Sequence, residues 1–149
     1  SCFTTGVTVV TAHTQGQDWG MTCNSFNTVS LDPAMVLWSV RKTSLSHEAF
    51  VNAGGYMVNV LGAQQKDVAL KFAQGTQAER FADQSLVRGL NQHPRLDGVI
   101  AWFDCRIAQV VSAGDHDILI GEVLDFGVHA GHGLAYAQRS FGVLAPMED

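Results

Sequence analysis

The sequence predicts a single, mostly β domain in which antiparallel strands form a closed or partly closed barrel with short helices packed outside. Apolar, β-branched runs of strand length outnumber helical stretches, and turn residues connect several of them as hairpins. The chain has 149 residues, of which 46% are hydrophobic, enough for one core without disulfides. No repeat or Pro/Ser-rich linker divides it, so residues 1–149 are expected to form one domain.

The first third of the chain is predicted to be largely strand. Residues 6–13 alternate and are rich in valine and threonine, which is typical of a strand, and a turn at 15–17 predicts a return strand over 19–24. Residues 25–32 contain turn-forming side chains before Pro33, so irregular backbone is expected there. Residues 34–41 are apolar on both faces at their centre and predict a buried strand.

A helix is predicted to follow. Thr43 or Ser44 is a suitable cap, Glu48 falls near the first turn, and Gly54-Gly55 ends the helix. Residues 56–61 then predict another buried strand.

The middle of the chain is predicted to be helical and then irregular. Residues 64–74 place apolar side chains four apart and predict a helix. Residues 78–81 predict a short helix or turn, and the polar stretch 82–97 is assigned no regular structure.

The last third returns to strands. Residues 99–113 and 118–126 predict a long hairpin across the turn at 114–117, and residues 134–144 predict a final strand. Because these apolar strands carry few charges at their edges, a partner chain is expected to cover an edge, and a homodimer is predicted.

Net charge and cysteine content restrict the binding partners and the cellular compartment that we expect. The net charge of -5 argues against nucleic acid or an anionic membrane as a partner. Cys2, Cys23 and Cys105 cannot all pair, which favours reduced thiols and a cytoplasmic protein. No apolar run reaches the roughly 18 residues of a membrane span. Ser1 nearly abuts a predicted strand, so the natural N-terminus is expected to be missing.

Several common catalytic motifs are absent. The sequence contains no glycine-rich phosphate loop, no nucleophile elbow around a serine and no paired-cysteine zinc signature. His129 and His132 could suggest a metal pair, but the glycines beside them favour a flexible turn, and no third ligand follows at a suitable spacing. No metal site is predicted.

The segment from Arg41 to His47 predicts an anion site. It joins a buried strand to a helix start and places two cations beside three hydroxyl groups, a combination that suits a phosphate monoester. An ordinary capped helix with solvated charges is equally consistent with these residues.

Two further segments are candidates for ligand contact. Residues 21–30 combine small and amide side chains with Met21 and Phe26, which suits a planar heterocycle, although a polar turn between strands explains them as simply. Cys23 has no feature of a reactive thiolate. His116 lies in a tight turn where it could donate to a ligand carbonyl or pyrophosphate, or simply bridge backbone groups.

Taken in order and spacing, the motifs resemble the short-chain flavin reductase family, the reductase components of two-component flavin-dependent monooxygenases. The matching segments are Gly6–Thr11, Gly20–Phe26, Val29–Pro33, Lys71–Ala73, Glu79–Phe81, Gly114–His116, Gly121–Val123 and Gly133–Tyr136, with Arg139 and Phe141. Each motif is weak alone, but together they cover almost the whole chain. The resemblance implies that the N-terminal helix that such proteins usually carry is absent from this sequence.

The resemblance implies an FMN-binding split β-barrel, antiparallel and Greek-key-like, that forms a homodimer with the flavin near the subunit interface. It implies an NAD(P)H:flavin oxidoreductase that reduces FMN, or FAD, and supplies reduced flavin to a partner monooxygenase. Two alternatives remain open: a reductase of another small molecule, such as a corrin, that keeps its flavin bound, and a non-enzymatic flavoprotein electron carrier.

The resemblance also assigns residues by position. The segment facing the flavin ring consists of Thr22, Asn24, Ser25 and Phe26. The ribityl-phosphate segment consists of Ser39, Arg41, Thr43, Ser46 and His47, and Phe72 and Ala73 are expected to close over the flavin. The nicotinamide side consists of His116, the candidate catalytic residue, with Tyr136, Arg139 and Phe141. Ser140 stands where many members carry a second arginine, which favours NADH over NADPH.

Overall fold

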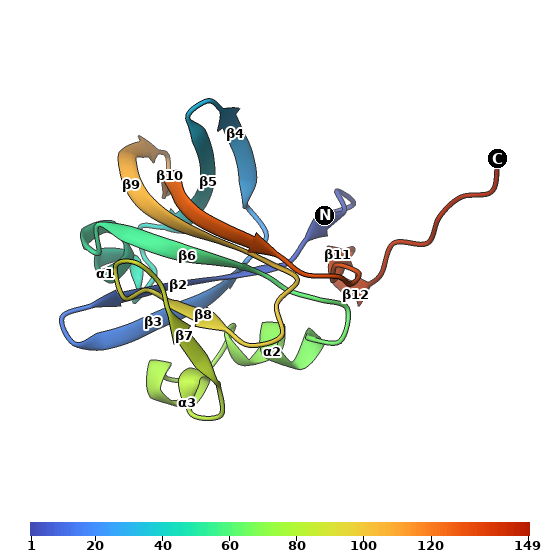
Figure 1. Ribbon diagram of the computed structural model, residues 1–149, viewed down its shortest axis with the longest axis horizontal. Helices are drawn as coiled ribbons and strands as arrows, with labels where there is room; N and C mark the ends of the chain where they lie inside the picture. Colours follow the sequence, from blue (N-terminus) through green and yellow to red (C-terminus); the bar gives the residue numbers. More distant parts are fainter.

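The computed structural model describes residues 1–149 and is built around a seven-stranded antiparallel sheet that curls over an apolar core (Figure 1). In spatial order its strands are β3 (Gln17–Cys23), β2 (Thr8–Thr14), β6 (Gly55–Val60), β9 (Ala101–Ala113), β10 (His116–Val128), β5 (Ala34–Arg41) and β4 (Asn27–Leu31).

Shorter elements surround this sheet. The helices are α1 (His47–Asn52), α2 (Lys66–Lys71) and α3 (Gln77–Phe81), and none is long and apolar enough to cross a membrane. β7 (Leu86–Arg88) and β8 (Pro94–Leu96) form a hairpin, and β1 (Thr5–Gly6), β11 (Ala135–Ala137) and β12 (Ser140–Gly142) form a small third sheet. The predicted mostly β fold with peripheral helices is confirmed.

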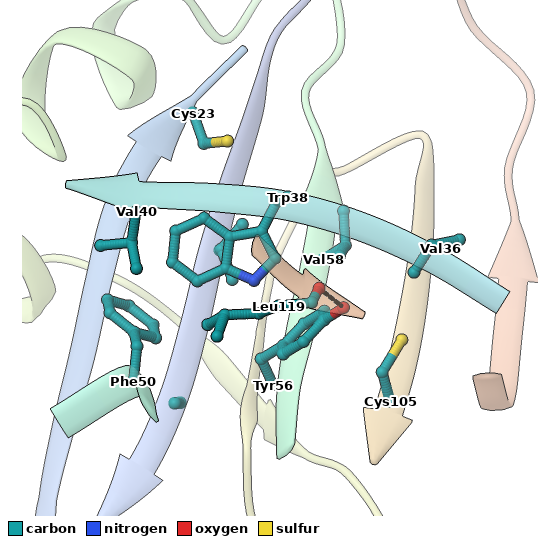
Figure 2. Close-up of a cluster of buried hydrophobic side chains, with 11 residues drawn as sticks. Cys23, Val36, Trp38, Val40, Phe50, Tyr56, Val58, Cys105 and Leu119 are labelled. Atoms are coloured by element: carbon teal, nitrogen blue, oxygen red, sulfur yellow. Dashed lines mark hydrogen bonds between the residues drawn. The ribbon is translucent and has the colours of Figure 1, made fainter. Parts of the chain in front are cut away.

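The core explains why the sheet curls. Trp38 of β5 packs edge-on against Phe50 of α1 and Tyr56 of β6, with ring centroids 4.9 and 6.0 Å apart (Figure 2). The Tyr56 hydroxyl donates to the Leu119 carbonyl at 2.9 Å. Because strands far apart in the sheet order share this core, the sheet must bend over itself. Burying these large side chains supplies much of the driving force for folding.

Side chains along β5 alternate between the two faces of the sheet, and this determines where Ser39 and Arg41 point. Val36, Trp38 and Val40 are buried in the core, so Ser39 and Arg41 project from the opposite face of the strand.

A second apolar cluster attaches α2 and α3 to the β2–β3 hairpin, and Figure 1 shows the two helices on the same side of it. Phe72 and Phe81 pack edge to face at 5.0 Å. A Cβ on Gly20 of β3 would lie 2.7 Å from the Phe72 ring, so glycine is required for this close approach.

Two segments predicted to be irregular are strands. The polar residues 27–31 form β4 because they pair with β5, from Asn27 opposite Leu37 to Leu31 opposite Ala34. Residues 86–96 form the β7–β8 hairpin, held by polar side chains from the main sheet. The Leu96 N–H donates to Asn59 at 2.9 Å and the Leu90 N–H to Asp104 at 2.8 Å. These partners are distant in sequence, so local composition could not reveal either strand.

The predicted strand over residues 134–144 is also wrong, because it is split into β11 and β12 by a two-residue turn. Gln138 and Arg139 adopt φ of 52° and 63° there. A two-residue turn with both central residues at positive φ normally favours asparagine and glycine, so no hairpin signal was visible. β10 begins at His116, earlier than predicted, which places this histidine in a strand rather than in the turn.

Candidate functional site

Two adjoining cavities lie between the end of β3 and the β11–β12 hairpin. The larger, about 590 Å³, is lined by Ser1, by residues 3–6, by the segment 24–27 and by the hairpin. The smaller, about 360 Å³, is bounded by the end of β3, by α2 and by the same hairpin. Asn24, Tyr136 and Arg139 line both, so the cavities form one depression. The structure thereby brings all four predicted ring-facing residues and three of the four predicted nicotinamide residues to the same depression.

The loop after β3 is held rigidly. The Ser39 N–H donates to the Ser25 hydroxyl at 2.9 Å, and the Cys23 sulfur lies 3.0 Å from the same oxygen. Phe26 stacks on Phe103 with ring centroids 5.7 Å apart. The Asn24 side chain makes no hydrogen bond within the chain and is exposed, so it remains available to a ligand.

Thr22 of β3 connects this strand to helix α2. The Thr22 N–H donates to the Phe72 carbonyl at 3.1 Å, and the Thr22 hydroxyl donates to the Ala69 carbonyl. The Phe72 ring is fully buried, so of the two helix residues predicted near the flavin only Ala73 lines the depression. Thr22 and Phe72 therefore act here mainly by setting the wall of the cavity.

The β11–β12 hairpin forms the opposite wall. Tyr136 and Phe141 pack edge to face at 5.0 Å, and the Lys66 ammonium lies 5.9 Å from the Phe141 ring. The left-handed turn exposes Arg139, which has no ion pair or hydrogen bond within the chain. Its guanidinium is free to bind an anion or a carbonyl at the mouth of both cavities.

The remaining predicted residues form a second group along β5, β10 and the start of α1. Arg41 lies directly opposite His116 in the sheet register. The His116 Nδ1 atom lies 2.7 Å from an Asp115 oxygen, and His47 Nε2 lies 2.6 Å from an Asp117 oxygen. The hydrogen bond from His116 lowers the pKa of Asp115, and the positive charges of His116 and Arg41 lower it further. Asp115 is therefore ionised at neutral pH and orients the imidazole.

The helix start differs from the prediction. α1 begins at His47 with Ser46 as the N-cap residue, not Thr43 or Ser44. The Ser44 N–H donates to the Arg41 carbonyl and the His47 N–H to the Ser44 carbonyl, so these residues form tight turns before the helix. Local hydroxyl-rich sequence favours such turns as readily as a cap, which is why the boundary was misplaced.

The residues that line the depression and the group along β5, β10 and the start of α1 are connected by a hydrogen bond but do not share a cavity. The bond between Ser25 and Ser39 links the ring-facing loop to the strand that carries Arg41. His116 lies with Arg41, however, and does not line the depression that contains Tyr136, Arg139 and Phe141. Residues 39–47 do not line it either.

Sequence reasoning missed two polar groups in this region. The Thr5 hydroxyl oxygen is buried without a hydrogen-bond partner, and Thr5 lines the larger cavity. Gln77 connects β3 to Ser46 through its amide. Neither residue belongs to a recognisable motif, and only folding places them here. No group of three or more His, Cys, Asp or Glu side chains is arranged to hold a metal ion.

Comparison with known proteins identifies the setting of this site. Residues 1–145 match the flavin reductase like domain family. The chain is 46% identical over 140 residues to the reductase component of a flavin-dependent trigonelline monooxygenase from Acinetobacter baylyi, covering 93% of this chain and 45% of that protein. It is 43% identical to the FMN reductase (NADH) SmoA from Agrobacterium fabrum, covering 94% of this chain and 79% of that protein.

Solved structures agree. The NADH:FAD oxidoreductase SgcE6 from Streptomyces globisporus superposes with a TM-score of 0.92 at 35% identity, covering 99% of this chain and 85% of that one. The predicted split-barrel fold of the flavin reductases is thereby confirmed. The chain spans less than half the length of the Acinetobacter protein and of a probable flavin reductase from Rhizobium meliloti, 45% in each case.

Proposed function

Since this chain belongs to the flavin reductase-like domain family, we propose that it is an NAD(P)H:flavin oxidoreductase that transfers a hydride from the nicotinamide to a free flavin. The observation that carries the proposal is the shared depression, where the loop Asn24–Phe26 faces the hairpin carrying Tyr136 and Arg139. A relative at 43% identity is named as an FMN reductase that uses NADH.

The residues present fit a flavin. The smaller cavity has mostly apolar walls, and the larger adds polar groups, among them the free amide of Asn24 and the buried, unpartnered hydroxyl of Thr5. This combination suits a planar ring with polar edges. A Cβ on Gly6, which lines the larger cavity, would meet nothing within 4 Å, so the space beside it is open. The flavin, when bound, supplies the hydride-accepting ring.

The chain's own residues orient the two reactants. Asn24, Ser25 and Phe26 hold the ring, and the segment Arg41–His47 holds the phosphate, with Arg41 free of any competing ion pair. Little acid–base chemistry is required, because alignment of the reactants is the main contribution of the protein.

His116 is proposed to contact the nicotinamide. When its Nδ1 donates to Asp115, the neutral imidazole presents Nε2 as an acceptor and the protonated imidazole presents Nε2–H as a donor. The carboxamide of nicotinamide contains both a donor and an acceptor, so either form of the histidine can bind it.

We propose FMN as the flavin and NADH as the donor. SmoA is named for FMN and SgcE6 for FAD, so the family accommodates both flavins. Arg139 is the only arginine of the β11–β12 hairpin, where Ser140 follows it, and a single guanidinium favours the dinucleotide without an additional phosphate.

The partners are proposed to be a second copy of this chain and a flavin-dependent monooxygenase that receives the reduced flavin. The relative from Acinetobacter is named as the reductase component of such a monooxygenase. On the main sheet Phe126, Val128 and Leu31 are 63%, 72% and 97% exposed, and such exposed apolar side chains suit burial against another copy. Sedimentation of the purified protein measures this directly, and a monomer at micromolar concentration would refute the homodimer.

The activity is tested by mixing the purified protein with NADH and an excess of FMN and following the nicotinamide absorbance. The proposal expects many turnovers per protein chain, limited by free FMN. Oxidation that stops after one flavin equivalent would favour a reductase with bound flavin that awaits another acceptor, such as a corrin. No oxidation of NADH or NADPH would refute the reductase function and leave an electron carrier.

A further inference from the structure

The side chain of Gln77 connects three elements around the proposed phosphate site. Its Oε1 atom accepts from the Gly20 N–H of β3 at 2.9 Å, and its Nε2 atom donates to the Ser46 hydroxyl oxygen, just before α1, at 3.2 Å. Gln77 itself is the first residue of α3. These contacts exist only in the folded chain.

The Gly20 bond determines which way the amide points. A backbone N–H can only donate, so the atom facing it must be the carbonyl oxygen of the glutamine. The amide nitrogen must then face Ser46, and the Ser46 oxygen must act as an acceptor. The hydroxyl hydrogen of Ser46 is consequently directed away from Gln77.

That hydrogen has no acceptor within the chain. Ser46 occupies the N-cap position of α1 but makes no side-chain capping bond, because its own backbone is helical with φ of -94° and ψ of -4°. The residue is only 6% exposed, and a buried hydroxyl normally finds a partner. The segment around it, residues 41–47, contains two cations and several hydroxyl groups, which favours an anionic acceptor.

We infer that Gln77 is a positioning residue that aims the Ser46 hydroxyl at the flavin phosphate. Gln77 does not touch the flavin in this arrangement and acts only through Ser46. The inference rests on the proposed function, because it requires a phosphate-bearing flavin in this site.

The variant Gln77→Glu tests the direction of the hydrogen. A glutamate of the same shape accepts from Gly20 with one oxygen and from the Ser46 hydroxyl with the other, so it turns that hydrogen inward. It also places a negative charge near the phosphate. The preference for FMN over riboflavin, measured as the ratio of their Kd values by quenching of flavin fluorescence, is expected to fall by about 10- to 100-fold.

A matched control separates this effect from added charge alone. Gln74 is exposed and its side chain makes no hydrogen bond, so Gln74→Glu adds the same charge three residues before Gln77 in the chain and is expected to leave the ratio within about threefold of the parent. If Gln77→Glu weakens FMN and riboflavin by the same factor, or leaves both unchanged, the inference is wrong.

A neutral variant covers the case in which Gln77→Glu does not fold. Gln77→Met removes both hydrogen bonds and, introduced into the parent protein, is expected to reduce the preference for FMN over riboflavin. Introduced into the Ser46→Ala variant, which has no hydroxyl to orient, it is expected to leave that preference unchanged. An equal reduction in both backgrounds would overturn the inference. If the parent protein itself binds neither flavin, the proposed function fails; if it prefers FMN and the variants keep that preference, only the role of Gln77 fails.

Discussion

The buried histidine of the β7–β8 connection should make the stability of this protein depend strongly on pH. His93 is 2% exposed, and its Nδ1 atom accepts from the His13 N–H at 3.0 Å. Burial, reinforced by the nearby charge of His13, lowers the pKa of His93 from 6.5 to about 4. Asp18 and Arg88 complete the charged groups on this side, since they pair with each other and with His13.

The sign of the effect follows from where the proton binds. Between about pH 4 and pH 6.5 the unfolded chain protonates this histidine while the folded chain does not, so the free energy of unfolding falls as the pH is lowered through that window. The difference in pKa corresponds to about 3 kcal/mol once both states are protonated. That is a large fraction of the stability of an ordinary domain.

Urea denaturation across this pH window measures the effect. His93→Gln removes the titration and keeps an oxygen that can accept from the His13 N–H, so the variant should lose about 3 kcal/mol less than the parent on acidification. His132→Gln serves as the control because His132 is exposed. The raised pKa of buried Asp104 acts in the opposite direction but is present in all three proteins, so it cancels in the comparison. A parent and a His93→Gln variant with equal pH dependence would refute this reasoning.

Three further predictions concern the site and its frame. Arg41→Ala should raise the Kd for FMN by about 10- to 100-fold and the Kd for riboflavin much less. If both Kd values change by the same factor, Arg41 does not bind the phosphate. His116→Ala should lower kcat/KM for NADH by about 10- to 100-fold, whereas parental activity would exclude the nicotinamide role. Gly20→Ala should destabilise the fold by about 1–3 kcal/mol in urea, because its Cβ would meet the Phe72 ring at 2.7 Å. Gly142→Ala, which meets no atom within 4 Å, should cost far less and is the matched control.

Local pattern was sufficient for the strands that build the main sheet. The alternating and apolar runs at residues 6–13, 34–41 and 56–61 correspond to β2, β5 and β6 with small shifts at their ends. The motifs around residues 22–26 and 133–141 also pointed to segments whose residues line the two adjoining cavities.

Local pattern failed where a distant partner determines the structure. The β7–β8 hairpin depends on Asn59 and Asp104, and β4 depends on its pairing with β5. The same reason explains why Thr5 and Gln77 were missed, since the cavity beside Thr5 and the Ser46 partner of Gln77 arise only from folding.

By itself, then, the order of residues determined the family and the mostly β fold, because these are encoded by contiguous motifs and by hydrophobic period. Only the tertiary structure decided which polar groups remain without partners and that Phe72 is buried instead of lining the cavity. It also decided that His116 lies beside Arg41 rather than beside Tyr136. Hydrogen bonding and packing are satisfied across the whole chain at once, so these outcomes depend on contacts between residues that no local window contains.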